Sequence, residues 1–333
     1  MQDTTVSAMA AIIGAGTMGK THAAAYRSAG ARVVAVCDVN SVQADALAAE
    51  VGATAYHSVD DLLAAVRPTV ISICTPPADH VAAACRVLQR GIPVLCEKPL
   101  AESVAGAQAI VMAAQEGGTV CMTGFCHRFH EPVLQIKDKL ERGEVGEPVL
   151  FRNRFAHYFH GVGQTWFADP GVSGGGTLMD TSVHSLDLYR FLIGEISHVA
   201  AELTTVTPGL NVEDNSVLLV NGPSGVPGII EASWTTPIGE SMLVIYGTKG
   251  TLTVDYAVGD FGIARIQRAS EPAPEELPRS ANNRFTAEIA HLIHCINAGL
   301  APSPDGHDGL RVLQVIEAAY HPRGRSGCAD VPA

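Results

Sequence analysis

A glycine-rich loop between two strand-like segments constrains the fold of this chain most strongly. The apolar segment AMAAII at residues 8–13 runs directly into GAGTMG, and the helix-like sequence THAAAYRSAG follows. Gly14, Gly16 and Gly19 match the pattern G-x-G-x-x-G, in which glycines allow a tight turn and let a pyrophosphate approach the backbone. A second apolar segment, ARVVAVC, ends at Asp38. This order of strand, glycines, helix, strand and aspartate predicts a dinucleotide-binding unit. The alternative is that the glycines only turn the chain.

The position of Asp38 also indicates which dinucleotide is bound. Asp38 lies 38 − 19 = 19 residues beyond Gly19, where an acidic residue accepts hydrogen bonds from the adenosine ribose. A carboxylate there repels a 2′-phosphate, and the surrounding sequence CDVNS supplies no arginine to reverse this preference. The sequence therefore predicts NAD as the cofactor, with NADP disfavoured.

Helix-like and strand-like segments alternate as far as residue 124. The helices are expected at 41–51, 79–90 and 103–117, and the strands at 70–74, 93–96 and 119–123. This alternation predicts an α/β fold, a doubly wound parallel sheet of the Rossmann type over residues 1–124. Ligands bind such sheets at the carboxyl ends of the strands. Thr75-Pro76-Pro77 and Glu97-Lys98-Pro99 follow two of these strands, and a cis bond before Pro99 would cost little.

The pattern changes after Gly124. Residues 131–142 suggest an amphipathic helix, residues 147–159 open a strand, and short β-rich segments follow at 198–207, 214–221, 227–236, 241–247 and 251–255. We expect residues 125–333 to form an α+β domain with a large open, mostly antiparallel sheet, whose final helices can pack back on the first domain. Residues 322–333 suggest a loosely held tail. An open sheet needs a cover, which predicts a homodimer or homotetramer.

Composition limits the possible partners. The chain has 333 residues and a net charge of −12, which argues against nucleic acid as a partner. No apolar run reaches the length of a membrane span, and the N-terminus lacks the features of an export signal. The 8 cysteines have no paired spacing, so we expect reduced thiols in the cytoplasm. Residues 1–124 carry 10 acidic and 7 basic residues and the remainder 24 and 15, an acidic second half that suits a neutral or cationic ligand.

The segment GGGTLMDTSVHSLDLYRFLIG at 174–194 holds a row of titratable groups. Asp180, His184 and Asp187 stand at i, i+4 and i+7, so a helix would line them along one face. Each has a structural alternative: Thr177-x-x-Asp180 resembles a capping box, His184 can be a core residue, and Asp187 can be a structural partner. Two carboxylates and a histidine also suit a metal, but no further residue completes a recognised spacing, and we expect none.

The quoted segments together resemble the Gfo/Idh/MocA family of nicotinamide-dependent oxidoreductases over most of the chain. The matching pieces are GAGTMG, CTPPADH, CEKPLA, GFCHRF, the 174–194 segment and DGLRVLQVIEAAY. In this family the lysine of EKP and the helix histidine carry catalysis, and the aspartate one turn earlier binds substrate. The resemblance therefore implies catalytic roles for Lys98, His184 and Asp180. In GFCHRF, Cys126 and His127 stand where many relatives have other polar groups, so the resemblance leaves the identity of the substrate open.

The resemblance also implies the ligand contacts. For NAD these are Gly14, Gly16, Thr17, Met18, Gly19, Asp38, Thr75, Pro76, His80, Glu97 and Lys98. For the substrate the resemblance implies Lys98, Asp180 and His184, and the sequence adds Arg128, His157 and Trp166 as residues expected to line the pocket. The expected reaction is hydride transfer between NAD and a secondary hydroxyl or ketone of a small polyhydroxylated compound, namely a sugar, a cyclitol or a cationic aminosugar. The alternatives are an NAD-dependent glycosidase, a sugar–sugar oxidoreductase that retains its cofactor, and a non-catalytic NAD-sensing regulator.

Overall fold

The computed structural model describes residues 8–258, 261–279, 282–321 and 328–332. The chain forms two compact units: Met1–Cys126 with Arg284–Leu310, and His127–Asn283 with Arg311–Ala333. The first unit thus ends two residues beyond the division expected from the sequence, and it regains a segment near the C-terminus. That segment contains helix α9 (Arg284–Ala298), which packs against α1 (Thr17–Ser28) within the first unit.

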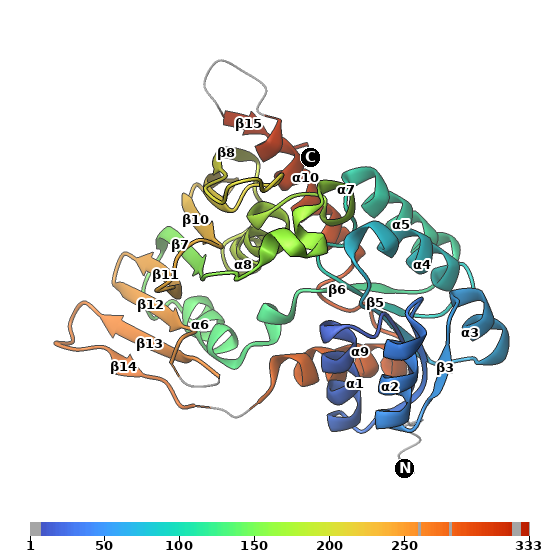
Figure 1. Ribbon diagram of the computed structural model, residues 1–333. Helices are drawn as coiled ribbons and strands as arrows, with labels where there is room; N and C mark the ends of the chain where they lie inside the picture. The colour runs from blue at the N-terminus through green and yellow to red at the C-terminus, as the bar shows by residue number, and fades with distance from the viewer. Residues whose placement is uncertain (1–7, 259–260, 280–281, 322–327, 333) are drawn as a thin grey trace, which may run out of the picture. The chain divides into compact units, whose positions relative to one another are not determined.

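The first unit contains the predicted doubly wound sheet. Its described strands are all parallel, in the order β3-β2-β1-β4-β5-β6. They are β1 (Met9–Ile13), β2 (Arg32–Cys37), β3 (Thr54–Tyr56), β4 (Val70–Ile73), β5 (Val94–Glu97) and β6 (Cys121–Gly124). The helices are α1, α2 (Ser41–Val51), α3 (Val59–Ala65), α4 (Pro77–Leu88), α5 (Val104–Glu116) and α9. Figure 1 shows α4 and α5 on one side of this sheet and α1 and α9 on the other.

Burial explains why these segments form a parallel sheet. Every residue of β4 and β5 is buried, as expected for strands covered by helices on both faces. Alternation of polar and apolar residues is therefore absent, and apolar runs are the only sequence signal. The short strand β3 and helix α3, at the sheet edge, were not predicted from the sequence.

The second unit contains the predicted open sheet. Its described strands have the order β14-β13-β12-β11-β7-β10-β9-β8-β15, and every neighbouring pair is antiparallel except β7 and β10. The strands are β7 (Pro148–Ala156), β8 (His198–Thr204), β9 (Asn215–Asn221), β10 (Gly228–Ser233), β11 (Ser241–Gly247), β12 (Gly250–Asp255), β13 (Ile263–Arg268), β14 (Glu275–Glu276) and β15 (Cys328–Asp330). Buried and exposed residues alternate along β9, so this sheet has one covered and one open face.

Helices cover one face of this sheet. Helix α6 (Glu131–Glu141) packs against β12 and β13, and α8 (Val183–Leu192) packs against β7 and β10. The short helix α7 (Pro170–Ser173) precedes the glycine-rich entry to α8, and α10 (Gly306–Tyr320) begins in the first unit and continues into the second.

The expected loose tail is wrong for its described part. Residues 328–330 form β15, which pairs with β8, whereas residues 322–327 and 333 lie outside the described part of the chain. A strand this short carries little sequence signal, because its pairing depends on an edge supplied by a distant segment. Among the described residues, no helix is both long enough and apolar enough to cross a membrane.

Candidate active site

The glycine loop leaves space at the start of α1. Gly14 adopts φ 97°, and a Cβ there would lie 2.6 Å from the carbonyl carbon of Cys74, so this position requires glycine. A Cβ on Gly16, by contrast, would meet nothing within 4 Å. Gly16 begins α1 with no side-chain cap, and the first turn, Thr17 and Met18 included, has no acidic residue. The N–H groups of this turn are therefore available to an anion such as a pyrophosphate.

Asp38 lies beside this loop at the end of β2. Its Oδ2 accepts a hydrogen bond from the backbone N–H of Ala15 at 2.7 Å, and its Oδ1 accepts one from the N–H of Asn40 at 2.8 Å. The carboxylate is half-buried and fixed by the backbone on both sides. This geometry fits the ribose-binding role predicted from the sequence.

The loop after β4 is held by His80. One ring nitrogen of His80 lies 2.8 Å from the carbonyl oxygen of Thr75, and the other lies 3.0 Å from that of Pro99. His80 is fully buried, and burial lowers its pKa, although the carbonyl groups oppose this shift. The imidazole therefore connects the loop after β4 to the loop after β5, and both nitrogens are engaged within the protein. The Thr75 Oγ1 atom is buried and has no hydrogen-bond partner among the described residues, which fits a hydroxyl kept for a ligand.

Glu97 forms a buried ion pair below the loop after β5. Its Oε1 lies 2.8 Å from Nε2 of His22, and its Oε2 accepts a hydrogen bond from the N–H of Lys98 at 3.2 Å. Burial opposes ionisation of both groups. The pKa of His22 is nevertheless raised well above its ordinary value by Cys74 and Glu97, and the pKa of Glu97 is lowered by His22 and Lys98. The pair is therefore charged near neutral pH. Lys98 itself is half-buried, and its bond to Pro99 is cis.

In the second unit, the predicted row of titratable groups starts in a π-helix rather than in an α-helix. Residues Leu178–Ser182 form the π-helical turn η4, and α8 begins only at Val183. Asp180 therefore lies in a π-helical turn, and only His184 and Asp187 stand in the α-helix that was expected to hold all three. Asp180 and His184 are both half-buried. Asp187 is 1% exposed and belongs to the interior.

Asp187 binds Arg128. The guanidinium donates from Nε to Oδ2 at 2.9 Å and from Nη2 to Oδ1 at 2.5 Å, a bidentate pair in which both side chains are buried. Arg128 was expected to contact substrate. In the structure this guanidinium joins the segment before α6 to the middle of α8, because a buried carboxylate requires a charged partner.

A glutamate from a distant segment caps the π-helical turn. Oε1 of Glu213 accepts hydrogen bonds from the N–H groups of Gly176 at 3.0 Å and Leu178 at 2.9 Å, and from the hydroxyl of Tyr320 at 2.8 Å. A Cβ on Gly176 would lie 1.8 Å from the Glu213 carbonyl oxygen, which explains the glycine. The alternative of a capping box at Thr177 and Asp180 is wrong, since Thr177 makes no side-chain cap.

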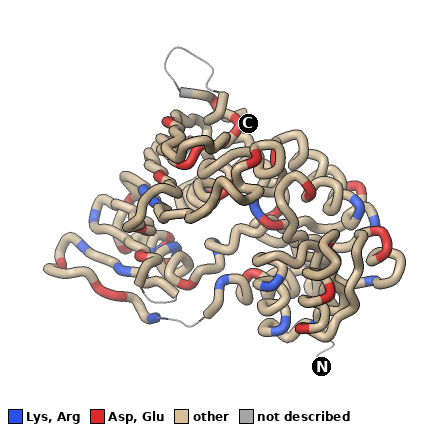
Figure 2. Tube along the Cα trace, in the orientation of Figure 1, with Lys and Arg blue, Asp and Glu red and all other residues tan. Residues whose placement is uncertain are grey.

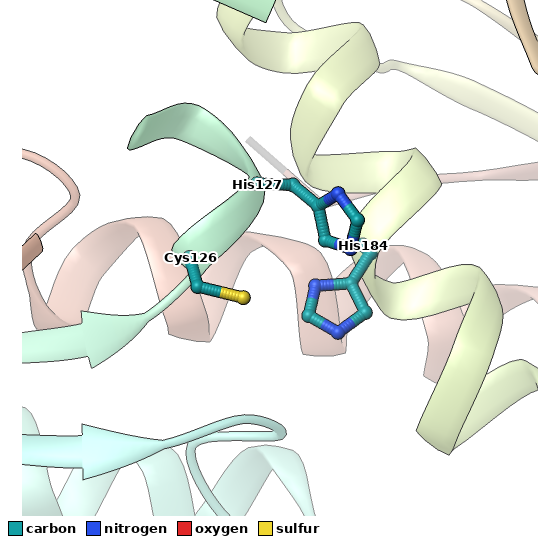
Figure 3. Close-up of side chains that lie close together, drawn as sticks. All are labelled: Cys126, His127 and His184. Carbon is teal, nitrogen blue, oxygen red and sulfur yellow. The ribbon is translucent and has the colours of Figure 1, made fainter. Parts of the chain in front are cut away.

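Several aromatic and imidazole rings pack near His184. The ring of His127 lies 4.7 Å from that of His184, centroid to centroid, and 5.4 Å from that of Tyr256. His130 stacks on Tyr256 at 5.5 Å, and Phe155 contacts both His127 and Tyr256. Figure 3 shows His184 projecting from its helix beside the ring of His127. We call His127, His130 and His184 the imidazole cluster. The motif GFCHRF was its only sequence signal, and no sequence pattern indicated that Tyr256 lies beside it.

The remaining predicted substrate residues lie at the surface. His157 is exposed, and Trp166 is 39% exposed and stacks on Phe167 with 3.8 Å between ring centroids. Both belong to the segment between β7 and α7, which packs on a small core of Val162, Val212 and Trp234. The second unit therefore brings Asp180 and His184 into one segment and places Trp166 and His157 in another.

The first unit has a parallel sheet with an open glycine loop at its carboxyl edge, and the second unit holds a half-buried carboxylate and imidazole. These features are typical of a dinucleotide-dependent oxidoreductase. Residues 9–125 match the family model described as the oxidoreductase family with an NAD-binding Rossmann fold, and residues 133–253 match the GFO/IDH/MocA C-terminal domain. The chain belongs to the GFO/IDH/MocA family, whose nucleotide-binding domain binds NAD.

Similar proteins support this membership. The inositol 2-dehydrogenase of Rubrobacter xylanophilus is 30% identical over 315 residues, covering 92% of this chain and 88% of that protein. The D-apiose dehydrogenase of Paraburkholderia graminis is 27% identical over 328 residues, covering 93% and 86%. The fold matches a solved levoglucosan dehydrogenase in complex with NADH and levoglucosan, with a TM-score of 0.90, 23% identity and coverage of 98% and 100%.

Proposed function

We propose that this protein oxidises a secondary hydroxyl of a small polyhydroxylated compound, a sugar or a cyclitol, with NAD as hydride acceptor. The observation that carries the proposal is the pairing of half-buried Asp180 and His184 in one segment of a chain that belongs to an NAD-binding oxidoreductase family. Relatives named as inositol and apiose dehydrogenases favour this substrate class.

Three residues divide the chemistry in this proposal. His184 takes the proton of the reacting hydroxyl, and Lys98 donates a hydrogen bond to the same oxygen as negative charge develops there. Asp180 accepts a hydrogen bond from a neighbouring hydroxyl of the substrate and orients the imidazole of His184. When bound, NAD supplies the electrophilic carbon that accepts the hydride.

The proposed NAD site uses the groups that the first unit leaves available. The N–H groups at Gly16, Thr17 and Met18 face the pyrophosphate, Asp38 accepts from the ribose, and Thr75 Oγ1 with Pro76 lines the nicotinamide end. His80 and Glu97 act as positioning residues, because their polar side-chain atoms already have partners inside the protein.

For the substrate, we assign Arg128 a positioning role through Asp187, while His157 and Trp166 form an outer edge of the substrate site. An exposed indole suits the apolar face of a sugar ring. The acidic second half of the chain favours an aminosugar among the candidates.

We also propose a homodimer or homotetramer that covers the open sheet face. Leu219 is 58% and Val217 45% exposed on β9, and their registered neighbours on β10, Ile229 and Glu231, lie on the same face. Figure 2 marks the charged residues along the chain, and on this sheet Glu231 forms ion pairs with both Arg152 and Arg154 of β7. Exposed apolar side chains gathered on one face of a sheet are typical of a protein–protein interface. Light scattering that gave a monomer mass at micromolar protein would contradict this proposal.

We place the protein in the cytoplasm, because the cysteines from Cys37 to Cys295 are free thiols. A periplasmic or secreted fraction containing most of the protein would argue against this location.

A substrate screen tests the proposed function. Sugars, aminosugars and inositols are mixed with NAD, and the absorbance of reduced nicotinamide is recorded. Reduction with at least one polyol supports the dehydrogenase. Release of a leaving group without net reduction would favour the glycosidase, cofactor retained through gel filtration would favour the sugar–sugar oxidoreductase, and NAD binding without turnover would favour the regulator.

A further inference from the structure

His184 lies beside a second imidazole and near a thiol that the proposed reaction does not use. Ring nitrogens of His127 and His184 lie within 4.8 Å of each other, and the rings are at 64° to each other (Figure 3). Cys126 directly precedes His127 in the 3-10 helix η1 (Cys126–Phe129), and its Sγ lies within the same distance of a His127 nitrogen. Two imidazoles and a thiol are the donor set that zinc favours.

We propose that His127 and His184, with Cys126 as a third ligand, bind a Zn²⁺ ion, and that this ion blocks catalysis by occupying His184. The first part concerns binding alone. The second part rests on the proposed function, since it requires His184 to be the base.

The geometry requires only a small adjustment. Nitrogen and sulfur ligands about 2.0–2.3 Å from a tetrahedral zinc ion lie roughly 3.3–3.6 Å from each other. The ligand atoms lie within 4.8 Å, so side-chain rotations that move them by about 1 Å are enough. The ring of His127 is held by Phe155 at 5.0 Å and Tyr256 at 5.4 Å, so His184 is the side chain expected to move.

Zinc must displace the proton of the thiol. Burial raises the pKa of Cys126 to about 12, although Arg284 opposes this shift. Binding therefore converts the thiol and the free ion into a zinc thiolate and one released proton, with no change of oxidation state. This cost makes Cys126 the weaker contributor and the imidazole pair the stronger one.

The chain offers a matched control site. Cys295 is also a buried thiol beside an imidazole, with Sγ 3.5 Å from Nε2 of His291 on α9. There, however, the same Nε2 already accepts a hydrogen bond from the N–H of Ser303 at 3.1 Å. Zinc at that site would have to break this bond, so we expect Cys295→Ser to leave zinc binding unchanged.

Calorimetric titration of the full chain with zinc sulfate tests binding without substrate or NAD. We expect one ion per chain, an affinity reduced at least ~100-fold in His127→Asn and at least ~10-fold in Cys126→Ser, and no change in Cys295→Ser. Cobalt replaces zinc as a spectroscopic probe, and its thiolate charge-transfer band should disappear in Cys126→Ser. If Cys126→Ser does not fold, Cys126→Ala serves instead. Unchanged affinity in His127→Asn, or a loss in Cys295→Ser, would overturn the site.

Turnover measured with a substrate from the screen tests the second part. Zinc should inhibit the wild type, EDTA should restore it, and Cys126→Ser should keep its basal turnover while requiring at least ~10-fold more zinc for half-inhibition. Equal zinc sensitivity in Cys126→Ser would overturn the proposed block. If no substrate is found, the titration still decides the binding site, so failure of the proposed function and failure of this inference are distinguishable.

Discussion

The two units hold their polar groups in different ways. In the first unit, the side chains behind the site are committed to internal partners: His22 to Glu97, and His80 to the carbonyl groups of two loops. Backbone N–H groups remain for the ligand. In the second unit, Asp180 and His184 stand in a π-helical turn and the adjoining helix, and His184 belongs to the imidazole cluster. We infer that the first unit determines cofactor affinity, that turnover depends on Asp180 and His184 of the second unit together with Lys98 of the first, and that substitutions should separate affinity from turnover.

The largest expected effect comes from the two proposed catalytic side chains. A general base contributes about a hundred- to ten-thousand-fold, so His184→Ala should lower turnover by that range and leave NAD affinity within about twofold. Lys98→Ala should lower turnover by at least as large a factor as His184→Ala. The turnover of the double variant should fall by a factor far smaller than the product of the two single losses, because the effects of groups that act as a unit are not additive. Steady-state kinetics and NAD titration check this. If His184→Ala turned over close to the wild-type rate, His184 would not be the general base.

The buried pair of the first unit should affect stability and not the chemistry. Removing one partner leaves a buried charge, so His22→Ala should lower the free energy of unfolding by about 3–5 kcal/mol. The lowered pKa of Glu97 stabilises the fold above pH 4.5 and is lost as pH falls, whereas the raised pKa of His22 stabilises it below pH 6.5 and is lost as pH rises through the raised value. The free energy of unfolding should therefore differ most between wild type and His22→Ala from pH 4.5 to pH 6.5.

Urea denaturation across this pH range measures the difference. A difference that is the same from pH 3 to pH 9 would show that the pair is not charged in the folded protein.

Asp38 should affect cofactor choice. Asp38→Ala removes charged hydrogen bonds worth about 1.5–3 kcal/mol each, so NAD affinity should fall by roughly 10- to 100-fold. The preference for NAD over NADP should narrow, because the repulsion of the 2′-phosphate disappears. Asp45→Ala, an exposed acidic residue on α2, is the matched control. Wild-type efficiency with NADP equal to that with NAD would contradict the proposed role of Asp38.

Substitution of Glu213 should have the smallest effect of the four, and it should change stability and turnover without changing NAD affinity. Glu213→Ala leaves the N–H groups of Gly176 and Leu178 without their acceptor and should cost about 1–3 kcal/mol of stability. Turnover should fall because Asp180 lies in the turn that Glu213 holds. Glu213→Gln keeps an acceptor oxygen and should recover most of both losses. A change in NAD affinity in either variant would contradict the inference that the first unit alone determines cofactor affinity.

The same difference decides what the sequence could predict. Gly14 needs glycine because of its backbone geometry, and the order of strand, glycines, helix, strand and Asp38 is a local sequence pattern, so the parallel sheet was predictable. The family resemblance pointed to Lys98 and His184. The family and the α/β plus α+β fold class are confirmed.

The second unit was less predictable because its contacts join distant segments. Glu213 caps a turn 37 residues away, and Arg128 binds Asp187 59 residues away, so neither contact has a local pattern. The π-helical turn has the same residue types as an α-helix, and the sequence therefore suggested an α-helical face. The carboxylate partner of Arg128 lies within the protein, and nothing in the local sequence indicates this pair.

The central claim is hydride transfer from a carbinol carbon, and an isotope measurement tests it most directly. The substrate found by the screen is prepared with deuterium on the carbinol carbon and mixed with NAD and the wild-type protein, and the reduced cofactor is isolated and analysed by mass spectrometry. The account predicts one deuterium in the reduced nicotinamide of each turnover, with none when the solvent alone is deuterated. Reduced cofactor that takes its hydrogen from solvent, or substrate consumed with no reduced cofactor formed, would contradict it.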